Sequence, residues 1–127
     1  MKATAIALFA GLAFASGAHA ADGKAVFDQI CLACHGATGA GLPGVFPPLA
    51  HSDFFKKAAP QKLASIVTHG LTGEVTVNGQ SYNNIMPPQT TLSDEEIAAV
   101  LNHVSTEYNK GKAVVTPDMV RKARATP

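Results

Sequence analysis

The sequence predicts an all-α fold of about four to five helices with one small β-hairpin. Apolar residues recur at helical spacing over residues 60–70 and 94–108, which indicates amphipathic helices that each bury one face. Between them, residues 74–82 alternate apolar and polar positions around Asn78-Gly79, a strong short hairpin signal. A chain of 127 residues fits one domain with a modest core.

The first twenty residues have the pattern of a secretory signal peptide. Met1-Lys2 supplies one positive charge, residues 3–17 are apolar and rich in alanine, and Ala18-His19-Ala20 is a small-x-small cleavage site. The apolar run is short for a membrane-spanning helix, and an uncleaved anchor is the alternative. We therefore expect residues 1–20 to be removed, and residues 21–127 to form an exported domain without stable membrane insertion.

Residues 21–33 are predicted to form the first helix of this domain. Asp22 is the expected N-cap, because its carboxylate can accept hydrogen bonds from backbone N–H groups of the first turn. Gly23 and Phe27 lie four residues apart on one face, and the small residue lets another helix approach closely. This face is therefore expected to pack against a later helix.

The first helix runs into Cys31-Leu32-Ala33-Cys34-His35, a C-x-x-C-H motif. Thiols three positions apart lie about one helical turn apart, so both can add to the vinyl groups on one side of a porphyrin. His35 is then placed to give the iron an axial imidazole. A redox C-x-x-C is expected beside a βαβ pattern, and a structural zinc site needs four ligands; the sequence offers neither. The motif predicts one haem c, covalently bound through Cys31 and Cys34.

Residues 35–48 are rich in glycine and proline, which predicts a loop. A ligating histidine usually donates its second ring N–H to a carbonyl or carboxylate, so a backbone carbonyl of this loop is the natural acceptor for His35. Residues 52–57 are then expected to form a short helical turn capped by Ser52.

The helix over residues 60–70 begins at Pro60, whose missing N–H costs nothing at the first position, and ends at Gly70. His69 lies in its last turn, where a protonated imidazole favours the helix dipole. We assign His69 that role in preference to iron ligation.

The longest helix, over residues 94–108, is predicted to begin at the capping box Ser93-Asp94-Glu95-Glu96. A brief C-terminal helix follows, opened by Thr116-Pro117-Asp118 and ending near Arg124.

Met86 stands before Pro87-Pro88, outside any periodic apolar stripe. A methionine in a helical stripe is usually a packing residue, whereas one held by prolines in a chain that needs a second axial ligand is a ligand candidate. We predict Met86 as that ligand. Bis-histidine ligation through His51, His69 or His103 is the alternative.

These motifs resemble those of class I cytochromes c, with the haem motif near the mature N-terminus and a methionine about fifty residues later. The resemblance covers residues 21 to about 124. It implies that Cys31 and Cys34 form thioethers, that His35 is the proximal ligand and that Met86 is the distal ligand.

The family also has a Pro-x-Leu motif twelve residues after the histidine, which Pro47-Pro48-Leu49 matches. The resemblance implies that the Pro47 carbonyl accepts the His35 N–H and that Leu49 packs on the haem. It also implies that the first helix crosses the helix over residues 94–108 near Val100 and His103. The family prefers an aromatic residue where His103 stands.

A closer resemblance is to the cytochrome c modules attached to dehydrogenases and copper nitrite reductases. Those modules also carry a segment like residues 114–124 after the helix that corresponds to residues 94–108. The matching segments are spread along the chain, at residues 45–50, 70–73, 77–79, 82–83 and 86–87.

The resemblance implies a periplasmic single-electron carrier, not an enzyme. Its partners would be redox proteins: a quinol–cytochrome c reductase, a dehydrogenase, a nitrite reductase or a terminal oxidase. Ten Lys and Arg against nine Asp and Glu leave no basic footprint for nucleic acid. The alternatives are an electron-transfer subunit of a periplasmic dehydrogenase or reductase complex, and a sensor or enzyme with a five-coordinate haem.

Overall fold

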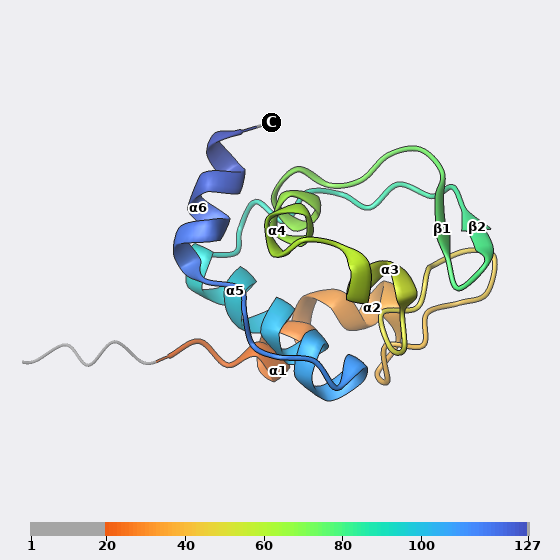
Figure 1. Ribbon diagram of the computed structural model, residues 1–127, viewed down its shortest axis with the longest axis horizontal. Helices are drawn as coiled ribbons and strands as arrows, with labels where there is room; N and C mark the ends of the chain where they lie inside the picture. The colour runs from red at the N-terminus through yellow and green to blue at the C-terminus, as the bar shows by residue number, and fades with distance from the viewer. Residues whose placement is uncertain (1–19, 127) are drawn as a thin grey trace, which may run out of the picture.

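The computed structural model describes residues 20–126, with helices packed around one another and a small sheet at one end (Figure 1). The predicted signal peptide lies outside these residues, apart from Ala20. No helix within the described part of the chain is long and apolar enough to cross a membrane.

The first helix is one continuous run made of α1 (Gly23–Val26), a π-helical segment η1 (Phe27–Cys31) and α2 (Leu32–His35). Its predicted bounds are confirmed to within two residues at each end. Asp22 caps it as expected, since its side chain accepts from two backbone N–H groups of the first turn. The π-helical segment, which the sequence did not indicate, ends at Cys31, the first cysteine of the motif.

Two helices follow the glycine-rich loop, α3 (Asp53–Lys57) and α4 (Pro60–His69). The hydroxyl of Ser52 accepts from the N–H of Phe55, which confirms the predicted cap, and the side chain of Phe55 is buried in the core. Pro60 and Gly70 bound α4 as predicted.

The predicted hairpin is confirmed as β1 (Val75–Val77) paired antiparallel with β2 (Gln80–Tyr82). Both turn residues, Asn78 and Gly79, have positive φ angles (51° and 80°), as a tight hairpin turn requires. The hairpin is tied to α3 by two reciprocal hydrogen bonds between Asp53 and Asn78. The Asn78 N–H donates to the carboxylate at 2.7 Å, and the Asp53 N–H donates to the amide oxygen at 2.9 Å.

The longest helix is α5 (Asp94–His103), which continues into a second π-helical segment, η2 (Val104–Tyr108). The predicted capping box at Ser93 and Glu96 is present.

α1 crosses α5 at Gly23, where an added Cβ would lie 2.9 Å from the Cβ of His103. The ring of Phe27 is fully buried there and meets those of His103 and Tyr108 at centroid distances of 5.9 and 5.2 Å. The histidine therefore takes the place of an aromatic residue in this crossing.

The C-terminal helix α6 (Pro117–Ala125) packs against α4 and α5 (Figure 1). Arg124 pairs with Asp94 at the start of α5 at 2.6 Å. His69, at the end of α4, hydrogen bonds through Nε2 to the carbonyl of Ala123 at 2.7 Å. α6 therefore holds the beginning of α5 and the end of α4 together.

Candidate functional site

A cavity of about 440 Å³ lies between the first helix, α4, α5 and the loops that follow them. Its lining is mostly apolar, and its volume is within the range of roughly 300–1,000 Å³ typical of small-molecule and cofactor sites. The cavity brings together every residue that the sequence analysis proposed for the site, namely Cys31, Cys34, His35, Pro47, Leu49 and Met86.

The two cysteines reach the cavity from the end of the first helix. Cys34 is exposed and Cys31 is half-buried, and the two are not joined in a disulfide. Burial raises the pKa of the Cys31 thiol to about 11, and the neighbouring Cys34 contributes in the same direction. Before haem attachment, Cys31 is therefore a neutral thiol at pH 7.

His35 is 9% exposed, and its Nδ1 lies 2.9 Å from the carbonyl oxygen of Pro47. A carbonyl can only accept, so Nδ1 carries the proton and Nε2 keeps a free lone pair. Burial lowers the pKa of His35, and the hydrogen bond to Pro47 opposes that effect in part. The side chain is therefore a neutral imidazole whose Nε2 is available to a metal, in the tautomer that a ligating histidine needs.

The loop after His35 folds back so that Pro47 reaches the imidazole. The N–H of Gly41 donates to the His35 carbonyl at 2.8 Å, and Leu42 and Phe46 exchange backbone hydrogen bonds. Gly41 has φ +68°, and an added Cβ would lie 2.8 Å from the Pro47 oxygen. Only glycine fits there without displacing that carbonyl.

Met86 lines the same cavity from the loop after β2, whereas the three alternative histidines do not. In the described part of the chain, His51, His69 and His103 are outside the set of lining residues. The imidazole of His69 instead bonds to α6, and that of His103 packs in the aromatic crossing. The structure therefore brings one imidazole and one thioether to the cavity, a donor set that suits a haem iron. Ligation itself stays a prediction.

Several polar side chains also reach the cavity, and sequence reasoning found only some of them. From their place in the sequence, Tyr82 and Asn84 are equally consistent with hydrogen bonding a haem propionate or steadying the Met86 loop and with being ordinary hairpin residues. Both line the cavity. The Tyr82 hydroxyl lies 3.2 Å from the side-chain oxygen of Gln80, and the Asn84 amide donates to the Val45 carbonyl at 3.0 Å. Ser52 and Gln29 line it as well, and no local pattern distinguishes them from surface residues.

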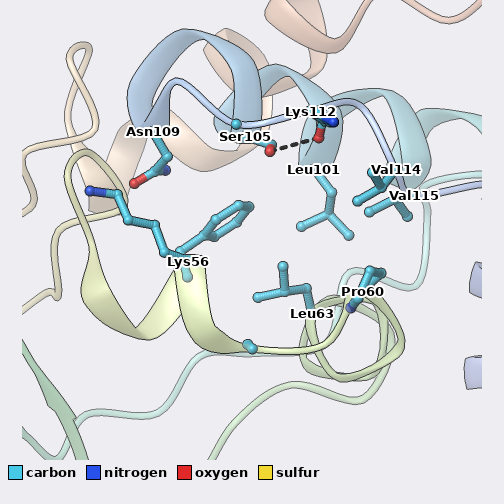
Figure 2. Close-up of a pocket in the computed structure, with 12 residues that line it drawn as sticks. Lys56, Pro60, Leu63, Leu101, Ser105, Asn109, Lys112, Val114 and Val115 are labelled. Carbon is cyan, nitrogen blue, oxygen red and sulfur yellow. Dashed lines mark hydrogen bonds between the residues drawn. The ribbon is translucent and has the colours of Figure 1, made fainter.

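A second, smaller cavity of about 290 Å³ lies behind α3 and α5 (Figure 2). It shares Phe55, Leu63 and Leu101 with the first cavity, so these side chains form a wall between the two. Figure 2 shows the side chain of Lys56 pointing away from those of Leu63, Leu101 and Pro60. Two of its polar side chains already have partners within the fold: the Ser105 hydroxyl donates to the Lys112 carbonyl, and the Asn109 amide donates to the carbonyls of Leu49 and Val104.

Sequence similarity relates this chain to known proteins. A family model described as cytochrome C oxidase, cbb3-type, subunit III matches residues 18–104. A cytochrome c-552 from Thermus thermophilus is 40% identical, over 98% of this chain and 88% of its own length.

Two relatives are subunits of larger enzymes. The fructose dehydrogenase cytochrome subunit of Gluconobacter japonicus is 26% identical, over 82% of this chain. The alcohol dehydrogenase (quinone) cytochrome c subunit of Gluconacetobacter polyoxogenes is 31% identical over the same share. The match spans only 22% of each of these relatives.

Proposed function

Since the chain belongs to the c-type cytochrome family described as cytochrome C oxidase, cbb3-type, subunit III, we propose that it is a periplasmic single-electron shuttle with a His35/Met86-ligated haem. The family membership establishes an electron-carrying cytochrome c whose haem c is attached through Cys31 and Cys34. The ligand set, the compartment and the partner proteins belong to the proposal.

The observation that carries the proposal is the cavity in which both cysteines, a neutral His35 and Met86 meet. When bound, the haem supplies a one-electron iron couple. The protein's own residues hold and shield it: Pro47 fixes the tautomer of His35, and the apolar lining excludes water. As a ligand, the thioether of Met86 would favour a higher reduction potential than a second imidazole would.

The methionine ligand is tested by comparing Met86→Ala with Met119→Ala, a methionine on α6 outside the cavity. We expect the oxidised wild type and Met119→Ala to show the thioether-to-iron charge-transfer band, and Met86→Ala to lack it and to bind carbon monoxide readily when reduced. A wild type without the band, or with open access for carbon monoxide, would instead favour the five-coordinate sensor or enzyme.

An exposed apolar patch next to the cavity supports docking of a redox protein at this edge. We define the rim patch as Leu42, Val45 and Ile85, whose side chains are 51%, 36% and 72% exposed. The hydrogen bond from Asn84 to the Val45 carbonyl joins the loops that carry Val45 and Ile85. Ile85 lines the same cavity as the exposed Cys34, so docking at the rim patch would bring a partner close to the haem site. Pro87, which also lines the cavity, extends the same edge.

A second candidate is an electron-transfer subunit of a periplasmic dehydrogenase or reductase complex. The likeness to two dehydrogenase cytochrome subunits favours it. Purification of the tagged protein from its native periplasm distinguishes the two, because a subunit would retain a catalytic polypeptide through size-exclusion chromatography and a shuttle would not.

Residues 1–20 are proposed as the cleaved signal peptide and residues 21–127 as the cytochrome domain. The intact mass of the protein purified from a periplasmic fraction tests this division. We expect a chain that begins at Ala21 and carries the added mass of one haem. A chain that keeps Met1 and fractionates with membranes would support the uncleaved anchor.

A further inference from the structure

The backbone of Met86 is paired with that of Leu71, the second residue after α4. The N–H of each residue donates to the carbonyl of the other at 2.9 Å, which makes an isolated antiparallel bridge. Residues directly opposite each other in such a pair project their side chains to the same side, and both side chains line the haem cavity. The bridge therefore fixes the point from which the Met86 side chain enters the cavity.

A further pair of hydrogen bonds fastens the residues after Met86. The N–H of Gln89 donates to the carbonyl of Val67 in α4 at 2.9 Å, and its side-chain amide donates to the carbonyl of Pro87 at the same distance. The two prolines between Met86 and Gln89 have no N–H to donate. The methionine loop is thus held at both ends by the last turn of α4 and the residue that follows the helix cap.

Gly70 lies where this loop and the end of α4 come closest. Its N–H donates to the Ile66 carbonyl at 2.8 Å and closes the helix, with φ at +79°. An added Cβ would lie 2.5 Å from the carbonyl oxygen of Met86 and 3.0 Å from the nitrogen of Pro88. Real Cβ atoms do not approach backbone so closely, so a side chain at position 70 must push the methionine loop away from α4.

We propose that Gly70-Leu71 is a positioning element that holds Met86 in reach of the haem iron, so that the close contact at Gly70 sets how firmly the thioether is bound. This rests on the proposed function, which makes Met86 the ligand. The end of α4 is itself fixed on its other side, because the side chain of His69 bonds to Ala123 of α6. The methionine loop is therefore hydrogen bonded to the end of α4, which is in turn bonded to α6.

The test compares Gly70→Ala with Gly73→Ala in the haem-loaded protein. Gly73 is the matched control, because its φ of +89° carries the same backbone strain while an added Cβ meets nothing within 4 Å. We expect Gly70→Ala alone to weaken the thioether charge-transfer band, to lower the reduction potential and to bind carbon monoxide about tenfold more tightly, because the open form gains population. Both variants should lose a similar amount of unfolding stability from strain.

The outcomes distinguish a failure of the proposed function from a failure of the positioning role. If the wild type lacks the band, methionine ligation fails and the proposed function fails with it. If the wild type has the band, and the two variants match each other in band, potential and carbon monoxide affinity, the positioning role is overturned while the proposed function stands.

If Gly70→Ala does not accumulate as a haem protein, amide hydrogen exchange of the wild type tests the positioning role instead. Strong protection of both the Leu71 and Met86 amides supports the positioning role. Exchange at the rate of open loops overturns it.

Discussion

The imidazole of His35 donates a hydrogen bond from Nδ1 to the carbonyl oxygen of Pro47 across 2.9 Å, although the two residues are twelve positions apart in the chain. The contact depends on a loop that returns at Gly41, where a Cβ would lie 2.8 Å from that same oxygen. It fixes the tautomer of the imidazole and makes Nε2 the nitrogen that can bind iron.

Replacing Gly41 by alanine is expected to raise the reduction potential. The Cβ displaces the Pro47 carbonyl, the hydrogen bond to His35 weakens, and a less basic imidazole stabilises ferric iron less. Redox titration of the purified protein measures the effect. Gly44→Ala is the control, because Gly44 has φ +74° and its added Cβ would meet only a side-chain nitrogen at 3.7 Å. Equal potentials in the two variants would contradict the role of this contact.

Replacing Ile85 by glutamate is expected to slow electron transfer to a protein partner about tenfold, equivalent to about 1.4 kcal/mol of lost docking energy. A charge within the rim patch has to be desolvated when an apolar partner surface covers it. Stopped-flow oxidation by a purified terminal oxidase from the source organism measures the rate.

Val114→Glu is the matched control for the docking surface. Val114 is 47% exposed, but it lies beside the second cavity and not at the rim patch. Oxidation by ferricyanide should be similar in both variants, because a small oxidant needs no docking surface. If the oxidase reacts equally fast with both variants, docking takes place elsewhere.

The Asp53 carboxylate is expected to contribute stability that disappears in acid. Its hydrogen bond from the Asn78 N–H lowers the pKa below the ordinary 3.8, and Lys57 adds to the effect. A carboxyl with a depressed folded pKa stabilises the fold above its unfolded pKa, and this contribution is lost as the pH falls below 3.8 through the folded pKa.

Denaturant unfolding of wild type and Asp53→Asn at neutral pH and below that value measures this linkage. The wild type should be the more stable at neutral pH, and the difference should shrink in acid. Glu74→Gln, which removes a charge from an exposed side chain just before β1, controls for the loss of charge alone. A difference between wild type and Asp53→Asn that stays constant with pH would contradict the assignment.

Local signals in the sequence were enough for most of the secondary structure. Asp22, Ser52 and Ser93 cap helices because their side chains satisfy backbone N–H groups only a few residues away. Asn78-Gly79 makes a hairpin because its two residues tolerate positive φ. Each of these depends on neighbours in the chain, so each is readable without the fold. The two π-helical segments had no such local signature.

The chain by itself also determined the chemistry, because C-x-x-C-H fixes the spacing of two thiols and an imidazole within one helical turn. Only the tertiary structure decided how the rest of the site is assembled. The bridge between Leu71 and Met86, the bond between His69 and Ala123, and the separation of the three other histidines from the cavity all join residues far apart in sequence. Such contacts follow from helix packing and loop closure, which local patterns do not encode.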